Sequence, residues 1–347
     1  EKDFSKIFTF QNIPMWSYLR SIFDEIFFEP YLPLYIRLID KLEEFLKQVK
    51  PKLIIQVYEA GPLAKSMEIA AKRLGIKTIG IQHAQIPFDY PDYIFKEVKN
   101  KNLSFGNPIP DFTFVFGQYH KELLSRQGSY PPEKLVVAGN SNLTYIDRIK
   151  QNLDRDKILK KYVISNKKII LVPLSFRYVT YKTSGDKFML DILFENLKDD
   201  ESVIVLVRPH PGDSLDQKIL SLDYTSKNFV CSTSSLFEDF IISDVVMLLP
   251  LSTIAAEAVI FEKPIILVNT VDNDDSKFDP NFQFLLKNNL AVSTSINNLI
   301  SNLNFIINEE ASTIDRSMQD NFLHKFFNFD KKCDYVSEIY NLIKTKN

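Results

Sequence analysis

Glycine and cysteine are scarce in this 347-residue chain, which holds nine glycines and two cysteines. It has no G-x-G-x-x-G segment. Residues 75–80 have the glycine spacing of a phosphate-binding loop, but Ile81 and Gln82 follow where lysine and serine or threonine are required. A bound phosphate would therefore be held by side chains and helix N-termini instead of a glycine-rich loop. The two cysteines, Cys231 and Cys333, are too few for a disulfide framework or a metal cage.

The chain also lacks an excess of one charge and any long apolar run. Its formal net charge is -2, from 42 basic and 44 acidic residues, which argues against a nucleic-acid-binding protein that depends on phosphate contacts. No apolar run approaches the roughly 18 residues that a membrane-spanning helix needs. The segment after Glu1 does not resemble a signal peptide, so we expect a cytoplasmic protein, with the inner face of the membrane as an alternative location. The missing initiator methionine suggests a fragment or a processed chain.

Short runs of Val, Ile and Leu alternate with helical patterns in two consecutive series. The first series has predicted strands at residues 52–57, 78–82, 112–116 and 135–138, and predicted helices at 16–28, 34–49 and 62–74. The second series has predicted strands at 168–172, 203–207, 229–231, 244–249 and 264–268, and predicted helices at 187–197, 235–242 and 253–261. Such alternation predicts parallel sheets with right-handed crossovers.

The expected fold class is therefore α/β, with two facing Rossmann-like domains and a ligand in the cleft between them. We place the N-terminal domain at residues 1–150 and the C-terminal domain at 151–330. Residues 331–347 are expected to form a C-terminal helix that can pack back on the first domain.

Polar residues follow two strands of the second series at the points where those strands end. Arg208 and His210 stand in an Arg-Pro-His-Pro run, whose prolines hold both residues in an extended conformation. Ser252 and Thr253 precede a helix and either can cap it, with Glu257 one turn further on. Ligands of parallel α/β sheets lie beyond the carboxyl ends of the strands. The pattern therefore predicts a phosphate site that combines an imidazole with a helix N-terminus.

These segments, followed by a strand that begins at Lys263-Pro264, resemble the C-terminal domain of glycosyltransferases of the GT-B architecture. The likeness is greatest to the surface-polysaccharide branch, which includes capsule transferases, CDP-glycerol glycerophosphotransferases and sialyltransferase-like enzymes. UDP-N-acetylglucosamine 2-epimerases share the fold and a related pattern. The resemblance covers roughly residues 165–270 and extends less specifically over 50–145. It implies that the first domain binds the acceptor and the second binds the nucleotide donor.

The resemblance also implies roles for the second-domain residues. His210 would face the leaving-group phosphate, with Arg208 either assisting it or serving the structure. Ser252 and Thr253 would donate to the phosphate, and Glu257 would accept from the ribose hydroxyls. The alternative is that His210 fills a corner at a strand end and that the helix is simply capped.

Ser175 and Arg177 belong to the loop after the first strand of the second domain. Ser175 is a candidate nucleotide contact there, because this loop contributes to nucleotide binding in several of the resembling enzymes. Arg177 could pair bidentately with a diphosphate. The alternative is that Arg177 is a solvated surface residue.

Three residues in the first series are candidates for the general base. His83 follows the second strand, where the resembling glycerophosphotransferases have a histidine that is usually followed by glycine; here Ala84 follows instead. An imidazole with a pKa near 6.5 is suited to taking a proton from an acceptor hydroxyl. Glu59, at the end of the first strand, and Asp89, in the long loop, compete with it. We rank His83 first, Glu59 second and Asp89 third.

No metal or resident cofactor is expected. The pairs Asp154/Asp156 and Asp272/Asp274 match D-x-D, but such triplets arise by chance among 44 acidic residues. The expected function is an inverting, metal-independent transfer of a sugar, or a polyol phosphate, in polysaccharide biosynthesis. The donor would be CMP-, CDP- or UDP-linked, and the acceptor a surface glycan or a lipid-linked molecule, with possible peripheral association with the membrane. Two alternatives remain: a nucleotide-sugar 2-epimerase, or a non-catalytic nucleotide-sugar-binding subunit of a glycan assembly complex.

Overall fold

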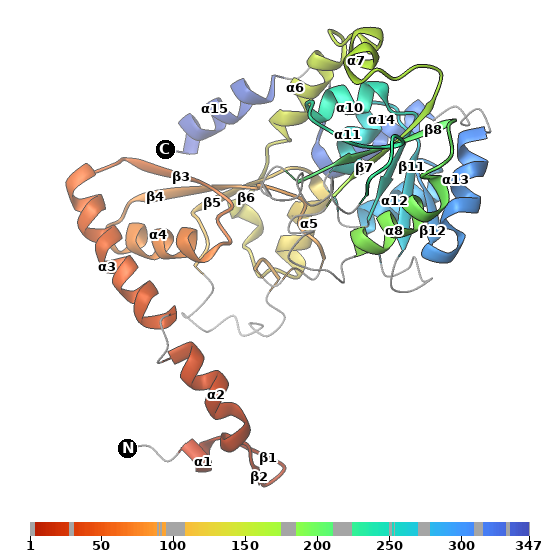
Figure 1. The fold of residues 1–347 in the computed structure, drawn as a ribbon. Coiled ribbons are helices and arrows are strands. Elements are labelled where there is room, and N and C mark those ends of the chain that lie inside the picture. Colours follow the sequence, from red (N-terminus) through yellow and green to blue (C-terminus); the bar gives the residue numbers. More distant parts are fainter. Residues whose placement is uncertain are drawn as a thin grey trace.

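The computed structural model describes residues 4–27, 31–88, 90, 92–94, 108–174, 185–210, 224–249, 252, 254–269, 278–308, 315–330 and 334–346. Two all-parallel sheets follow one another along this part of the chain. The first has the strand order β3-β4-β5-β6, and the second has the order β12-β11-β10-β7-β8-β9. Figure 1 shows the first sheet in orange and yellow and the second in green and blue. The predicted pair of Rossmann-like sheets is confirmed.

The first sheet contains β3 (Leu53–Val57), β4 (Lys77–Ile81), β5 (Phe112–Val115) and β6 (Leu135–Val137). Helices α3 (Tyr31–Val49) and α4 (Pro62–Arg73) pack together on one face, where Leu46 meets Ala70 and Ala71. Helix α3 begins three residues before its predicted start, so Pro33 lies inside its first turn. A proline is tolerated there because the first N–H groups of a helix have no intrahelical acceptor.

The opposite face of the first sheet is covered by the C-terminal helix α15 (Tyr335–Lys346). Its Ile339, Leu342 and Ile343 pack against a cluster that contains Ile79 and Phe114. Figure 1 shows this helix returning beside β3–β6, far from the helices that precede it in sequence. The C-terminal helix and the pair α3–α4 therefore cover opposite faces of one sheet.

The second sheet contains β7 (Lys168–Pro173), β8 (Val203–Arg208), β9 (Phe229–Cys231), β10 (Val245–Leu248), β11 (Ile265–Asn269) and β12 (Val292–Ser295). The first five were predicted. Strand β12 was not, because its Val-Ser-Thr-Ser sequence has neither an apolar run nor a clear alternation. It lies at the edge of the sheet, where polar strands are common.

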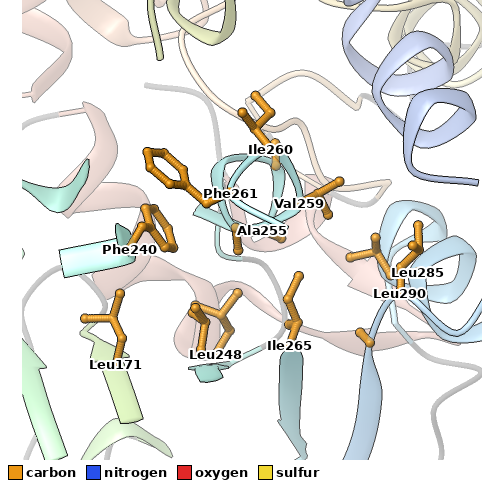
Figure 2. Packing of buried hydrophobic residues seen from close by; sticks show 14 of the residues in the cluster. Leu171, Phe240, Leu248, Ala255, Val259, Ile260, Phe261, Ile265, Leu285 and Leu290 are labelled. Atoms are coloured by element: carbon orange, nitrogen blue, oxygen red, sulfur yellow. The ribbon is translucent and has the colours of Figure 1, made fainter. Parts of the chain in front are cut away.

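Both faces of the second sheet are buried, as expected for a parallel sheet. Ile169 and Leu171 of β7 point into one core, and Ile170 and Val172 point into the other. Figure 2 shows part of the first core, where residues of α11 pack over the strands beside Phe240. The first core is enclosed by helices α6 (Ser141–Lys150), α7 (Arg155–Tyr162), α10 (Leu236–Ile242), α11 (Ile254–Ile260), α12 (Pro280–Lys287) and α14 (Arg316–Phe327). The second is enclosed by α8 (Gly185–Leu197) and α13 (Leu299–Asn308).

The remaining elements lie outside these layers. At the N-terminal end are α1 (Phe4–Ile7), the two-stranded antiparallel ribbon of β1 (Thr9–Phe10) and β2 (Ile13–Pro14), and α2 (Trp16–Phe27). Figure 1 shows them extending away from both sheets. None of the described helices combines the length and the hydropathy that a bilayer span requires.

Contacts between loops and helices join the two halves of the fold, and two of them are specific. The Phe88 N–H donates to Asp279 Oδ2 at 3.0 Å, linking the loop after β4 to the residue that caps α12. Gly117, the N-cap of α5 (Gln118–Arg126), lies against the C-terminal end of α14. A Cβ on Gly117 would be 2.4 Å from the carbonyl carbon of Phe326. Only glycine allows this close approach of two backbones.

Gly117→Ala should therefore destabilise the fold. The added methyl group meets backbone atoms that cannot rotate away, so we expect a loss of about 1–3 kcal/mol, typical of overpacking. Urea unfolding monitored by circular dichroism measures it. Gln118→Ala, one residue further on and exposed, should stay within about 0.5 kcal/mol of the wild type. Equal stability of the two variants would show that α5 and α14 do not touch at this point.

Candidate functional site

Two of the residues predicted to bind the donor, His210 and Ser252, lie at the carboxyl edge of the second sheet. Strand β7 pairs with β8 on one side and with β10 on the other, so successive connections leave it in opposite directions. Such a switch point creates a crevice beyond the strand ends, where α/β proteins bind ligands. His210 follows β8 by two residues, and Ser252 follows β10 by four. Both therefore flank the carboxyl end of β7.

The exposed fractions of these residues fit a rim position. His210 and Ser252 are both partly buried. Glu257 lies in the first turn of α11, where its Oε2 is buried and has no hydrogen-bond partner within the described part of the chain. Burial raises the pKa of Glu257 to about 7. The predicted residues Ser175, Arg177 and Thr253 lie outside the described residues.

Arg208 is anchored to the body of its own domain. Its Nη1 donates to Asp239 Oδ2 at 2.7 Å, to the Ser234 carbonyl oxygen at 2.8 Å and to Ser232 Oγ at 3.3 Å. Asp239 is fully buried on α10. The sequence left two roles open for Arg208, assisting His210 or supporting the structure. These contacts favour the structural role.

The first sheet presents His83 at its own carboxyl edge. The residue follows β4, and its side chain is exposed. The ring of Tyr58, at the end of β3, lies 6.0 Å from the imidazole, measured between ring centroids. The Tyr58 hydroxyl donates to Asp92 Oδ2 at 2.7 Å and lies 3.0 Å from the Tyr90 hydroxyl. The imidazole therefore stands beside a polar aromatic cluster that holds Tyr90 and Asp92 of the long loop. Asp89 lies outside the described residues.

Glu59 occupies a different environment from His83. Only 2% of its surface is exposed, and Tyr93 donates its hydroxyl hydrogen to Glu59 Oε2 at 3.2 Å. The carboxyl group lies against Gly80 of β4, where a Cβ would approach Glu59 Cγ to 2.6 Å. Burial raises the pKa of Glu59 to about 7. Its other oxygen, Oε1, is buried without a hydrogen-bond partner among the described residues.

Tyr58 has an unusual backbone conformation that helps to explain this arrangement. Its φ of 61° lies in the left-handed region, which is costly for a residue with a Cβ. The turn is stabilised by the bond from the Tyr58 N–H to the Ile81 carbonyl oxygen at 3.3 Å. It allows two consecutive side chains to contact the long loop: Tyr58 contacts Tyr90 and Asp92, and Glu59 contacts Tyr93. Sequence reasoning missed Tyr58 and Asp92, since partners 34 residues apart leave no local pattern.

The acidic pairs do not form a metal site in the described part of the chain. Asp154 caps α7, where its Oδ1 accepts from the N–H groups of Asp156 and Lys157. Within the described ranges, no group of three or more His, Cys, Asp or Glu side chains could hold a metal ion. Asp272 and Asp274 lie outside those ranges.

The fold is of the GT-B type, with two Rossmann-like sheets. The UDP-GlcNAc 2-epimerase of Methanocaldococcus jannaschii, solved with UDP-GlcNAc and UDP, is 13% identical with a TM-score of 0.58; the match covers 89% of this chain and 80% of that one. A glycosyltransferase of Rickettsia africae is 17% identical, with a TM-score of 0.55 and coverage of 92% and 84%. The wall teichoic acid polymerase TagF, solved after a CDPG soak, is 14% identical, with a TM-score of 0.52 and coverage of 97% and 98%.

At these identities the likeness establishes the fold and not the reaction. No protein-family model matches the chain. No curated protein matches it either. The suspected relationship to GT-B enzymes is confirmed at the level of architecture.

Glu59→Gln should change how stability depends on pH. Burial raises the pKa of Glu59 from 4.5 to about 7, so the native state keeps a proton that the unfolded chain has lost between these values. Stability falls as the pH rises through this window, and above it the buried carboxylate costs about 3 kcal/mol. The glutamine variant avoids this cost. Relative to the wild type, its unfolding free energy should rise by about 2–3 kcal/mol between pH 5 and pH 8.5.

Urea unfolding at several pH values measures this difference. Glu44→Gln, at the exposed Lys41–Glu44 pair, is the matched control, and its difference from the wild type should stay flat across the range. An equally flat profile for Glu59→Gln would show that the carboxyl group is hydrated in solution.

Proposed function

We propose that this protein is an inverting, metal-independent GT-B-type transferase, which moves a sugar or a polyol phosphate from a nucleotide-activated donor to a surface-glycan or lipid-linked acceptor. The observation that carries the proposal is the position of His210 and Ser252 on either side of β7, at the switch point of the second sheet. Solved neighbours of the same fold were determined with UDP-GlcNAc and UDP, and with CDPG. A CMP-, CDP- or UDP-linked donor fits this group.

The donor side would bind the nucleotide through its phosphate. The His210 imidazole and the Ser252 hydroxyl supply hydrogen-bond donors, joined in the proposal by Thr253, Ser175 and Arg177. Donors fixed before the reaction stabilise negative charge without reorganising. The ribose hydroxyls would donate to Glu257, whose Oε2 is buried without a partner in the described chain. Burying a polar atom without a hydrogen-bond partner is costly. A ligand hydroxyl that donates to Glu257 Oε2 would remove this cost.

The acceptor side would use His83 as the general base. Its exposed ring lies at the carboxyl edge of the first sheet, whereas Glu59 is buried beneath the loop and already accepts from Tyr93. This contrast supports ranking His83 above Glu59; Asp89 remains the third candidate. Tyr58 and Asp92 would keep the neighbouring loop in place for the acceptor.

For a sugar donor, the reaction is a single displacement at the anomeric carbon. His83 removes the proton of the acceptor hydroxyl as its oxygen bonds to that carbon, and the bond from the carbon to the phosphate oxygen breaks. The electron pair leaves with the nucleotide, where His210 and Ser252 offset the growing charge. Attack opposite the leaving group inverts the configuration. Closure of the two domains would exclude water and so limit hydrolysis of the donor.

A nucleotide-sugar 2-epimerase is the second candidate, favoured by the neighbours that carry this activity. The two functions differ in what happens without an acceptor. Incubation with UDP-GlcNAc alone would give the 2-epimer if the protein is an epimerase, and would leave the sugar unchanged if it is a transferase. Nuclear magnetic resonance of the anomeric proton distinguishes the two products.

His210→Ala and His83→Ala should fail in different ways. CMP, CDP, UDP and GDP are first screened for thermal stabilisation, since a ligand at concentration [L] adds RT ln(1 + [L]/Kd) to stability. With the nucleotide that binds, His210→Ala should lose about 1.5–3 kcal/mol of binding free energy, the loss of a charge-assisted hydrogen bond. His83→Ala should keep this affinity and lower the single-turnover rate by roughly 10²–10⁴-fold.

His324→Ala provides the control for losing a histidine elsewhere, on α14, and should leave both quantities unchanged. Unchanged binding and rate in His210→Ala would refute the donor site. Near-native turnover in His83→Ala, with none in Glu59→Gln, would move the base to Glu59.

Turnover should also survive removal of divalent cations. In the proposed site the growing phosphate charge is stabilised by protein hydrogen-bond donors, so EDTA should change the rate by less than about twofold. Loss of turnover that magnesium or manganese restores would contradict this, and would direct attention to Asp272 and Asp274. The assay uses the full chain with and without EDTA, and inert ionic strength is matched with sodium chloride.

A further inference from the structure

We infer that Asp239 is a positioning residue for the donor site: it holds Arg208 and so fixes the strand end from which His210 projects. This inference rests on the proposed function, because it assigns His210 to the nucleotide phosphate. Asp239 itself lies on α10, which packs on the face of the sheet that carries the first core, and would not touch the donor.

The carboxylate of Asp239 is the centre of a buried network. It is 0% exposed and accepts from Arg208 Nη1 at 2.7 Å and from the Ser232 hydroxyl at 2.6 Å. The Tyr162 hydroxyl lies 3.4 Å from its other oxygen. Burial raises the pKa of Asp239, while the hydrogen bonds from Ser232 and Arg208 act in the opposite direction. A buried carboxylate with these donors is held in one geometry, since every alternative leaves polar groups unpaired.

The helix that carries Asp239 is itself firmly anchored. Helix α10 begins with a capping box, in which the Glu238 N–H donates to Ser235 Oγ at 3.2 Å and the Ser235 N–H donates to Glu238 Oε2 at 2.9 Å. Phe240, next to Asp239, is fully buried in the first core. Asp239 is therefore a fixed point relative to the sheet, not a mobile surface group.

The end of β8 is fixed on three sides. The Leu174 N–H donates to the Arg208 carbonyl oxygen at 2.9 Å, and the Ser232 N–H donates to the Val207 carbonyl oxygen at 2.7 Å. The Arg208 side chain supplies the third contact, to Asp239. Only Pro209, whose ring restricts φ, separates this anchored residue from His210. A displacement of Arg208 would therefore move His210 by a similar distance.

The same network argues against Arg208 as a direct phosphate ligand. Its Nη1 already has Asp239, the Ser234 carbonyl oxygen and Ser232 within hydrogen-bond distance. Turning Nη1 from Asp239 towards a phosphate would leave this carboxylate buried without its cation, which is strongly unfavourable. The two roles predict opposite effects of neutralising Asp239. If Arg208 binds the phosphate directly, neutralising Asp239 would free Arg208 to bind it more tightly. If Asp239 anchors Arg208, neutralising Asp239 would weaken nucleotide binding.

The test measures nucleotide affinity of Asp239→Asn and Arg208→Gln by isothermal titration calorimetry, with whichever of UDP, CDP, CMP or GDP the wild type binds. Both variants should bind at least tenfold more weakly. The double variant should bind no more weakly than either single variant, because the pair acts as a unit. Unchanged or tighter binding by Asp239→Asn would overturn the inference.

The matched control is Arg155→Gln. Arg155 and Asp244 form another Arg–Asp pair of the same domain, with Nη2 and Oδ1 3.3 Å apart, at the opposite, amino edge of the sheet. Breaking this pair should leave nucleotide affinity within twofold of the wild type. An equal loss of affinity in Arg155→Gln would show that the effect is general loosening of the domain and would also overturn the inference.

A second readout does not need a nucleotide. The chain has four histidines, so selective histidine labelling gives few imidazole signals, and His210→Ala identifies that of His210. Asp239→Asn and Arg208→Gln should shift the His210 signal, and Arg155→Gln should not. If Asp239→Asn fails to fold, Arg208→Gln, at a partly exposed side chain, carries both measurements. A His210 signal that stays unchanged in the anchor variants would overturn the inference.

Failure of the proposed function has a different signature. A wild-type protein that binds none of the four nucleotides would refute the donor site, while the imidazole signal would still report whether Asp239 positions His210. Nucleotide binding that His210→Ala weakens and Asp239→Asn does not would leave the proposed function intact and refute the positioning role alone.

Discussion

The parallel pairing of β7 with both β8 and β10 places the candidate donor residues on one rim. All carboxyl ends of a parallel sheet face the same edge, and the chain leaves β7 first in one direction and later in the other. His210 and Ser252, 42 residues apart in sequence, therefore flank the end of one strand. The buried Val, Ile and Leu residues on both faces of the sheet hold this register, because a slip of one residue would exchange the two cores.

Polar groups beneath the rim hold the strand ends in place. Asp239 fixes Arg208 in the second domain, and Tyr58 fixes Asp92 in the first. In each case a residue next to a strand end reaches a partner that lies more than 25 positions away. Such contacts tie loops, which would otherwise be the most mobile part of an α/β fold, to a rigid sheet. The catalytic geometry that we propose depends on these supports as much as on the histidines.

The buried carboxyl groups of the two domains differ in their partners. Asp239 has a guanidinium and a hydroxyl as donors, whereas Glu59 has a single tyrosine hydroxyl and one oxygen without a partner in the described chain. Burial raises the pKa of Glu59 and of Glu257 to about 7 in each case. Asp239 thus has a cation at hydrogen-bond distance, whereas Glu59 has only a neutral hydroxyl as a side-chain partner within the described residues. The position of Glu59 at a strand end made it a candidate base. The sequence does not show that its carboxyl group is buried.

Much of the architecture could be predicted from local pattern. Within the described residues, nine of the ten parallel strands follow from short apolar runs, and their alternation with helices indicates two parallel sheets. Strands β1, β2 and β12 and helices α1, α6, α12, α13 and α14 were missed. The polar β12 is a strand only because β11 lies beside it. The association of α14 with Gly117 of α5 is likewise set by a contact between distant segments.

The sequence by itself determined the α/β class, the strand ends and the residues that stand there, since periodicity, proline and polar breaks act over a few residues. Only the tertiary structure decided which of those residues face one another and which are withdrawn. It exposed His83, buried Glu59 under Tyr93 and directed Arg208 towards Asp239. The physical reason is that the burial and the hydrogen-bond partners of a side chain depend on residues far away in the sequence. A local sequence pattern carries no information about such contacts.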